Sequence, residues 1–533
     1  MADANLADWL RERDIPAAPA VDVVYGGAFS IKDYYMESGN PRQMRGASQL
    51  LLDVAAEPEL KKYRFFACGA ESFLIVPKGE GKDYARALEQ SFREKTLTAQ
   101  AAAVWRETTV EALLDAGQFN ELWEELNKAF GKRRMLLFPP LELPEDNYDY
   151  EDDEKNVDYV KHHDEEGQCR RCRYRKSTRI ADLSENYGGP FLLCPSCAHK
   201  EARGGYSSRI AYKKECIDRC KEFGIAAWHV EEDKLWPHGV QDIADRNRNG
   251  DINRNGDIAL LYGDINNLGG AGLLLKGDVW ERKRFSEAVD NTVRQALFEA
   301  ISRAVPLSED GAVAPRARFE IIAMGGDDIC VLLPGEVALL AGTLLLREFD
   351  ERWEKTGFAR LTISAGIAMG QANTPILYMR EAAEQLLKLA KDKAHEKNCS
   401  CLDILSLNSD GQWATSIEKK LRASLIKHES GQDASLTMRP FTVAEAAKLL
   451  QCLQKYEISA STLHNIAEAS LRCGIAEGDL WFRYLQSRQN NVGLDSLAKE
   501  YHCYMYSRDG GAAKTSPWRD LAELRGQKGG DCL

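Results

Sequence analysis

The pattern of apolar and polar positions from residue 258 to residue 405 predicts a mixed α+β domain. Strands are expected at 258–262, 361–369 and 401–405, a β-hairpin at 319–333, and helices at 284–304, 337–353 and from residue 374 onward. Short apolar runs indicate the strands, whereas apolar residues three and four positions apart indicate the helices. The elements therefore follow the order strand, helix, hairpin, helix, strand, with one more helix and strand at the end.

The last helix of this region has the clearest beginning. Thr374 suits the N-cap and Pro375 the first helical position, because proline has a fixed φ and no N–H to lose. The apolar residues that follow form one stripe: Met379, Ala382, Ala383, Leu386, Leu387 and Ala390. The order β-α-β-β-α-β, with the additional helix and strand, predicts a ferredoxin-like fold whose first strand lies beside the central hairpin.

The central hairpin carries the strongest chemical signal. Residues 321–333 read IIAMGGDDICVLL, two apolar runs joined by Gly325 and Gly326. A two-residue primed turn needs positive φ, which glycine adopts without steric cost, so Asp327 and Asp328 are expected at the hairpin tip. Adjacent carboxylates repel each other, and Mg²⁺ is a cation that prefers carboxylate oxygen. For an isolated GGDD, an acidic polar turn is the alternative interpretation.

A third carboxylate favours the metal interpretation. Asp264 closes the apolar run in IALLYGDINNLGG, residues 258–270, on the strand expected beside the hairpin. Three carboxylates on neighbouring strand ends suit two Mg²⁺ (or Mn²⁺) ions, an arrangement that joins nucleotides. Lys391 follows the apolar stripe of the last helix and could reach a triphosphate, although a solvated lysine is the alternative.

An internal repeat precedes this region. Residues 21–130 also alternate strands and helices, and FFACGAESFLIVP at 65–77 aligns with the GGDD hairpin. The aligned pairs are Gly27 with Asp264, Gly69 with Gly325, Ala70 with Gly326, Glu71 with Asp327, and Ser72 with Asp328. The first copy keeps one acid of three, too few to hold two cations, so we expect it to be catalytically silent while still able to bind a nucleotide. Coincidence between two short apolar hairpins is the alternative.

Between the copies, the cysteine spacing predicts a metal site. Two C-x₂-C pairs, separated by 21 residues, provide Cys169, Cys172, Cys194 and Cys197. Paired thiolates on tight turns can meet tetrahedrally around Zn²⁺, and four thiolates leave no open position, which favours a structural role.

Two other features receive a simpler interpretation. Cys216 and Cys220, four residues apart on a predicted helix, are expected to be buried free thiols rather than a lesser metal site. His163 and Asp164 form an HD pair without further histidines nearby, so we expect a solvated loop.

Composition places these regions in one large chain. The 533 residues include 14 cysteines, too few and too unevenly spaced for a disulfide scaffold, and carry a net charge of −12. The acidity argues against a free-standing nucleic-acid binder, since phosphate contacts leave a basic footprint. No apolar span or signal peptide is evident, so a cytoplasmic protein without membrane contact is expected.

Four regions are expected along the chain. They are 1–140, the degenerate first copy with an N-terminal helix; 141–257, an acidic linker and zinc-binding insertion; 258–410, the GGDD domain; and 411–533, a helical domain. From about residue 411 only helices are expected, and the tail beginning near residue 508 is predicted to be loose. A docking or scaffold role is the expectation for this last region.

Taken in order, these features resemble a known family. The degenerate first copy, the four cysteines, the strand ending at Asp264, the GGDD, LTISAGIAM at 361–369 and TMRPFT at 437–442 resemble the large polymerase-like subunit of type III CRISPR effector complexes. The palm domain of that family is related to the GGDEF nucleotidyl cyclases. The resemblance covers about residues 21–504 and implies two ferredoxin-like palm domains, a zinc insertion and a C-terminal helical domain.

The resemblance also implies an activity and partners. Similar members polymerise ATP into cyclic oligoadenylates for antiviral defence when their RNA-guided complex captures target RNA. Other subunits of the ribonucleoprotein largely hold the guide and target RNA. Many members begin with an HD nuclease domain, whereas here the first palm starts almost at once, so signalling without DNA cleavage is expected.

Residue roles follow from motif position. The resemblance implies that Asp264, Asp327 and Asp328 are catalytic, that Asp264, Ile265, Asp327 and Asp328 bind magnesium, and that Gly325, Gly326, Asn267 and Lys391 bind nucleotide. Alternatives are a catalytically idle scaffold subunit, transfer of AMP to S-adenosylmethionine, and a GTP enzyme resembling the diguanylate cyclases. The sequence leaves the nucleotide base open.

Overall fold

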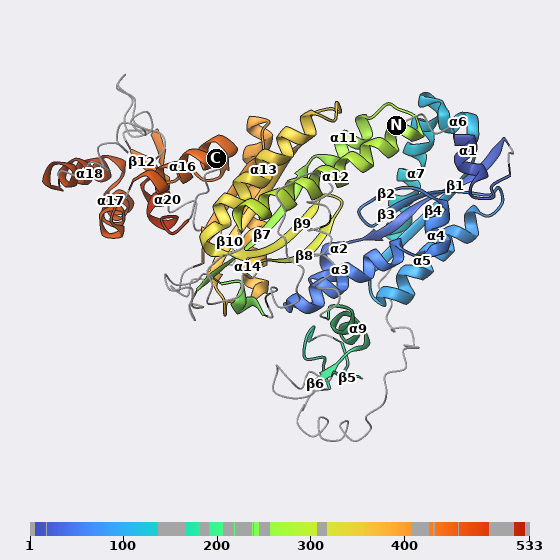
Figure 1. Ribbon diagram of the computed structural model, residues 1–533, viewed down its shortest axis with the longest axis horizontal. Helices are drawn as coiled ribbons and strands as arrows, with labels where there is room; N and C mark the ends of the chain where they lie inside the picture. Colours follow the sequence, from blue (N-terminus) through green and yellow to red (C-terminus); the bar gives the residue numbers. More distant parts are fainter. Residues whose placement is uncertain are drawn as a thin grey trace. The chain divides into compact units, whose positions relative to one another are not determined.

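Figure 1 shows the computed structural model of the chain, whose described residues fall into two compact units. The described ranges are 6–16, 19–136, 167–173, 175–177, 179–181, 191–205, 218, 237, 239–244, 256–305, 317–407, 426–429, 432–456, 458–489 and 516–527. The first unit comprises Met1–Glu215, Leu268–Val293 and Ile321–Asp327, and the second comprises Cys216–Asn267, Arg294–Glu320 and Asp328–Leu533.

The first unit contains a four-stranded antiparallel sheet in the order β2-β3-β1-β4. Its strands are β1 (Ala20–Phe29), β2 (Arg64–Cys68), β3 (Glu71–Val76) and β4 (Gln100–Thr109). The accompanying helices are α1 (Leu6–Arg11), α2 (Ile31–Tyr35), α3 (Pro41–Ala55), α4 (Pro58–Tyr63), α5 (Gly81–Thr96), α6 (Val110–Leu114) and α7 (Ala116–Leu136). Antiparallel pairing throughout follows from the hairpin β2–β3 and the antiparallel registers of β1 with β3 and β4.

Aromatic packing holds α7 against this sheet. The Trp123 ring of α7 lies 4.9 Å from Tyr25 of β1 and 6.0 Å from Phe73 of β3, measured between ring centroids. Phe66 of β2 stacks on Phe73 at 4.9 Å, and Phe119 is fully buried beside them. Such pairs stabilise a core beyond the area that they bury.

The second sheet has six strands in the order β14-β11-β10-β7-β9-β8. Its strands are β7 (Asp257–Asn266), β8 (Glu320–Gly325), β9 (Asp328–Pro334), β10 (Thr362–Gln371), β11 (Cys401–Ser406) and β14 (Phe441–Thr442). The portion β8-β9-β7-β10 repeats the strand order of the first sheet, and β11 adds to β10 in parallel. This order confirms the predicted α+β fold with the first strand beside the central hairpin.

The helices between these strands are α11 (Leu268–Leu274), α12 (Val279–Ala304), α13 (Ala338–Glu354) and α14 (Ile376–Lys397). Three of these four helices were predicted and α11 was not, and α12 begins five residues before the predicted residue 284. The predicted apolar stripe of α14 is buried along its whole length. The helix begins one residue later than predicted, with Pro375 at the N-cap and no side-chain cap, which lies within the usual uncertainty of helix ends.

The region after residue 411 is not made of helices alone. Alongside α16 (Val443–Lys455), α17 (Ala460–Cys473) and α18 (Ile475–Gln489) it contains a hairpin of β12 (Ile426–Glu429) and β13 (Gln432–Ser435). Strand β14 pairs with β11 of the second sheet, and Thr442 then caps α16 with a capping box to Glu445. Strands of two and four residues are too short to show a two-residue period in the sequence, which is why the expectation failed.

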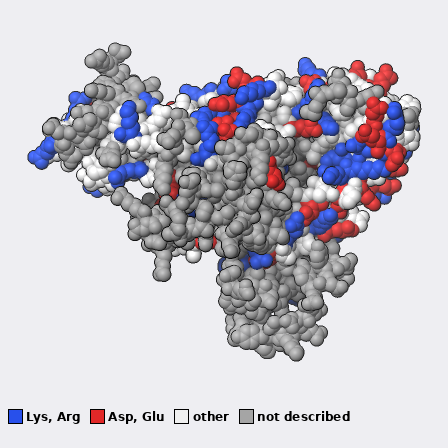
Figure 2. All heavy atoms as spheres, in the orientation of Figure 1, with Lys and Arg blue, Asp and Glu red and all other residues white. Residues whose placement is uncertain are grey.

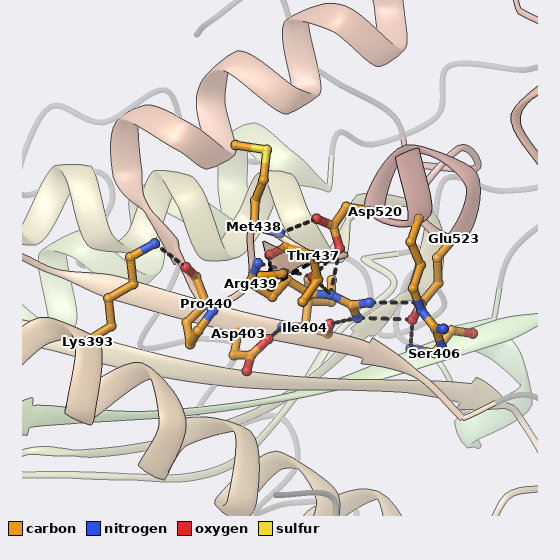
Figure 3. A network of polar contacts seen from close by, with 12 residues as sticks. Lys393, Asp403, Ile404, Ser406, Thr437, Met438, Arg439, Pro440, Asp520 and Glu523 are labelled. Atoms are coloured by element: carbon orange, nitrogen blue, oxygen red, sulfur yellow. Dashed lines mark hydrogen bonds and ion pairs between the residues drawn. The ribbon is translucent and has the colours of Figure 1, made fainter. Parts of the chain in front are cut away.

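Part of the predicted loose tail is also packed. Helix α20 (Trp518–Glu523) is anchored by Arg439, which lies between Asp520 and Glu523 (Figure 3). The Trp518 ring lies 4.9 Å from Phe482 of α18, and both side chains are buried. A hydrophilic tail can dock through a few buried residues, and such isolated residues give no periodic pattern in the sequence.

Surface charge is mixed among the described residues on the face shown in Figure 2. On this face, Lys and Arg side chains lie among Asp and Glu side chains rather than in one extended patch of a single sign. No helix within the described ranges is long and apolar enough to cross a membrane.

Candidate functional site

The GGDD turn is shifted by one residue from the predicted position. Gly325 ends β8, and the two turn residues are Gly326 and Asp327, with Asp328 beginning β9. Gly326 has φ +61°, the positive value that type II′ turns reserve for the first central residue. Either glycine could supply positive φ, so the sequence alone did not distinguish the two turns.

The register of the second sheet brings two of the predicted acids together. Strands β7 and β9 pair Tyr262 with Cys330 and Gly263 with Ile329, where the pairing ends; extending this register by one position places Asp264 opposite Asp328. Asp264 is largely buried and Asp328 partly so. The Tyr262 hydroxyl donates to Oδ1 of Asp328 at 3.5 Å, a contact that the sequence analysis did not foresee. Both carboxylates therefore lie at the same end of two neighbouring strands, β7 and β9, in the second unit.

Lys391 of α14 forms an ion pair with Asp264. Its side chain is 29% exposed, so it is neither fully solvated nor buried. The ion pair brings the Lys391 ammonium group to the Asp264 carboxylate, and its contact with a triphosphate stays a prediction.

The two residues that follow Asp264 differ in exposure. Ile265 is buried and pairs with Ile363 of β10. Because its side chain has no ligand atom, only its main-chain carbonyl oxygen could bind a cation. Asn267 is exposed just after β7 and has φ +55°, a left-handed conformation that asparagine tolerates better than most residues. Its amide is thus available at the end of the strand that carries Asp264.

Asp327, in the turn, belongs to the first unit. Burial raises the pKa of Asp327, and the nearby positive charge of Lys32 on α2 opposes this effect. The turn glycine lies close to the corresponding turn of the first sheet: a Cβ on Gly69 would lie 3.6 Å from Cα of Gly326. The β2–β3 and GGDD turns therefore approach each other within this unit.

The first copy aligns with the second one residue away from the predicted correspondence. Its turn residues are Gly69 and Ala70, Gly69 has φ +57°, and Glu71 begins β3 opposite Gly27 of β1. By turn geometry and register, Glu71 corresponds to Asp328 rather than to Asp327. The expectation that Gly27 corresponds to Asp264 agrees with the register.

Two features distinguish this first copy from a cation site. A Cβ on Gly27 would lie 2.1 Å from the carbonyl oxygen of Ala70, so the backbone leaves no room for a carboxylate there. Glu71 accepts a hydrogen bond from the Tyr25 hydroxyl. Burial raises the pKa of Glu71, while the Tyr25 hydrogen bond and the positive charge of Arg134 lower it. The Glu71 carboxylate is thus hydrogen-bonded within the protein.

The four predicted cysteines form a buried cluster in the first unit. Their Sγ atoms all lie within 4.8 Å of one another, and the Cys172 and Cys194 sulfurs are 3.9 Å apart. Four thiolates bound at about 2.3 Å to a tetrahedral zinc ion lie about 3.8 Å apart. The cysteines therefore fit a structural Zn²⁺ site.

Local structure explains how the cysteines meet. Cys194 ends the short hairpin of β5 (Arg179–Ala181) and β6 (Phe191–Leu193) and serves as N-cap of α9 (Pro195–Arg203), where the Cys197 N–H points at its sulfur. In the first pair, Arg173 has φ +63° and its N–H donates to the carbonyl oxygen of Cys169 at 2.9 Å. Each C-x₂-C pair is thus a tight turn. His163, Asp164, Cys216 and Cys220 lie outside the described residues.

Comparison with known proteins agrees with this geometry. Residues 257–401 match the family model described as "Cas10/Cmr2, second palm domain". The chain contains a Cas10/Cmr2 second palm domain. That segment includes Asp264, the GGDD turn and Lys391, and so confirms the part of the resemblance that rests on the GGDD domain.

Solved structures extend the likeness to nearly the whole chain. A Csm1–Csm4 cassette in complex with pppApApA matches with a TM-score of 0.52 and 12% identity, covering 97% of this chain and 71% of the other. The cassette in complex with cA3 matches with a TM-score of 0.51 and 11% identity, covering 96% and 70%. At such identity the likeness shows the fold. No curated protein matches the sequence.

Proposed function

We propose that this protein is a Mg²⁺-dependent nucleotidyltransferase that makes cyclic oligoadenylates from ATP as the palm subunit of a type III CRISPR complex. The observation that carries the proposal is the register that places Asp264 opposite Asp328 inside a Cas10/Cmr2 second palm domain. Paired carboxylates with a nearby lysine suit phosphate chemistry better than a solely structural strand edge.

The acids fit the predicted cation site. Asp264 and Asp328 would hold Mg²⁺ (or Mn²⁺), with Asp327 and the carbonyl of Ile265 in support. The bound cations would lower the pKa of a 3′-hydroxyl and stabilise in-line displacement at an α-phosphate. Lys391 would neutralise Asp264 before nucleotide arrives and contact the triphosphate afterwards.

The turn backbone would complete the nucleotide site. Gly325 and Gly326 carry no side chains, so a triphosphate can approach the hairpin closely, and Asn267 offers an exposed amide at the end of β7. The first sheet shares the strand order of the second and would be a silent palm, because Gly27 has no room for an acid and Glu71 is held by Tyr25.

The proposal includes partners and regions. The similar solved chains were captured as Csm1–Csm4 cassettes with pppApApA or cA3, which supports an equivalent subunit and adenylate binding here. Guide and target RNA would be held largely by other subunits, in keeping with the net charge of −12. We retain the boundaries 1–140, 141–257, 258–410 and 411–533, and a cytoplasmic location, as proposals.

The test is nucleotide use by the assembled complex. The purified assembly is incubated with labelled ATP, GTP, CTP or UTP and Mg²⁺, with and without target RNA. Cyclic products from ATP that need target RNA are the expected result. Products from GTP alone, or from no nucleotide in an intact assembly, would overturn the proposal.

A further inference from the structure

Glu37 joins the two halves of the four-cysteine site. Its carboxylate accepts from Arg175, which follows the first cysteine pair, and from Lys200, which follows the second, with Lys200 Nζ 2.5 Å from Oε2. Lys200 is buried, donates also to the carbonyl oxygen of Tyr34 at 2.7 Å, and lies 3.9 Å from the centroid of that ring. One carboxylate thus receives a cation from each cysteine pair.

The second cysteine pair is fixed independently on α3. A Cβ on Gly46 of α3 would lie 1.9 Å from the carbonyl oxygen of Lys200, and one on Gly204 would lie 1.8 Å from that of Arg42, so the backbones of α3 and α9 are in direct contact. The Arg45 guanidinium donates to the carbonyl oxygen of Gly204 at 2.6 Å. These contacts place Lys200 whether or not a metal is bound.

The first cysteine pair reaches the second through polar contacts as well as through the metal site. Arg175 pairs with Glu37, Arg171 pairs with Glu201 of α9 at 3.5 Å, and the Arg170 N–H donates to the carbonyl oxygen of Leu192 at 3.1 Å. A tetrathiolate metal links this pair rigidly to α9. A bound metal therefore strengthens the link that holds Arg175 against Glu37 together with Lys200.

Helix α2, which lies just before Glu37 in the chain, is near the GGDD turn. Helix α2 begins directly after Ser30, which has φ +50° and follows the last residue of β1. Strand β1, which α2 follows, ends beside the β2–β3 turn: a Cβ on Gly27 would lie 2.1 Å from the carbonyl oxygen of Ala70, and one on Gly69 would lie 3.6 Å from Cα of Gly326. The start of α2, with Lys32, therefore lies at the end of the first sheet that approaches the Gly326–Asp327 turn, and the Lys32 charge acts on Asp327. The helix spans only five residues and has no side-chain N-cap, so it has little stability of its own and depends on contacts such as those of Glu37.

We propose that Glu37 couples the four-cysteine metal site to α2, so that a bound metal holds Lys32 beside the Gly326–Asp327 turn. Glu37 is a positioning residue, and Lys32 is an additional charge that assists triphosphate binding at the turn. This second step rests on the proposed function; the coupling itself does not. The zinc site would accordingly influence the nucleotide site as well as the stability of the insertion.

The test measures hydrogen exchange of the peptide covering residues 30–38 in the full chain. Chelation of zinc from the wild type should speed exchange there about tenfold or more, because the charged hydrogen bond from Arg175 to Glu37 is lost. Glu37→Gln should show the fast exchange while zinc remains at about one ion per chain. Asp53→Asn, which removes the ion pair between α3 and Arg203 of α9 at 2.6 Å, is the matched control and should leave α2 protected.

The outcomes separate the coupling from the chemistry. Wild-type exchange in zinc-loaded Glu37→Gln would overturn the coupling, and so would an equal effect of Asp53→Asn. If Glu37→Gln does not fold, Arg175→Met, which removes only the partner from the first cysteine pair, must produce the same loosening. For the assembled complex, Lys32→Gln should raise the KM for ATP more than it lowers kcat. Absence of any nucleotide joining in the wild type would refute the proposed function and leave the exchange result intact.

Discussion

Arg439 should be a highly sensitive position in the second unit. Its guanidinium donates to Oδ1 of Asp520 at 2.9 Å, to Oε2 of Glu523 at 2.9 Å and to the carbonyl oxygen of Ile404 at 2.6 Å (Figure 3). The side chains of Arg439 and Asp520 are 5% and 0% exposed. Arg439→Met would keep much of the volume and leave two carboxylates without their buried cation.

The magnitude follows from this burial. Burial raises the pKa of Asp520, and Arg439 is the main influence opposing it. Removing one partner of a buried ion pair costs about 3–5 kcal/mol, because the remaining charge is uncompensated. At 1.4 kcal/mol per factor of ten, this is about 10²–10⁴ in the equilibrium between docked and released α20.

Hydrogen exchange of residues 518–524 measures that equilibrium locally, without assuming that the whole chain unfolds in one step. Exchange should accelerate by about 10²–10⁴, or reach the rate of an unprotected peptide. Arg519→Met is the matched control, since Arg519 is 29% exposed and lies 4.0 Å from Glu523. Such a pair contributes at most about 1 kcal/mol, so less than about tenfold acceleration is expected. Equal effects of the two substitutions would refute the reasoning.

Three further predictions concern the first unit and its metal. Burial raises the pKa of Glu71 above its ordinary 4.5, so the folded state binds more protons than the unfolded state. The stability that this group contributes is therefore fully present below pH 4.5 and falls as pH rises through the pKa of the folded state. Glu71→Gln should therefore gain melting temperature relative to the wild type as pH increases from 4.5 to 8, and a pH-independent difference would contradict this. Cys194→Ser should reduce zinc from about one ion per chain to nearly none and lower the melting temperature, measured by metal analysis and calorimetry; a zinc-free protein with an unchanged melting curve would count against the site. Gly27→Asp should destabilise the first sheet without creating activity, because its Cβ would meet the carbonyl oxygen of Ala70 at 2.1 Å; a stable variant that binds Mn²⁺ in that sheet would show the reasoning to be wrong.

Sequence reasoning located the acids of the second sheet because strand order decides which strands are neighbours. In a β-α-β-β-α-β arrangement the first strand lies between the third and the fourth, so Asp264 and Asp328 had to be close once the order was recognised. The four cysteines were equally accessible, since C-x₂-C spacing encodes a tight turn. Both inferences rest on local geometry or on topology.

Other details depended on choices that sequence does not expose. Two consecutive glycines allow two turns, and the choice of Gly326 shifted the correspondence of Glu71 by one residue. The ion pair from Lys391 to Asp264 depends on side-chain reach between a helix and a strand. The docking of α20 depends on Arg439, a single buried charge whose partners are about 80 residues away in the chain.

The central claim is that nucleotides are joined only at the carboxylates of the second sheet. The direct measurement is conversion of labelled ATP by the assembled complex with target RNA. Asp264→Ala, and Asp327→Ala combined with Asp328→Ala, should abolish product while assembly, followed by size-exclusion chromatography, survives. Glu71→Ala, at the corresponding position of the first sheet, should retain much of the activity. Activity in the double variant, or a Glu71→Ala complex as inactive as the double variant with assembly intact, would contradict the account.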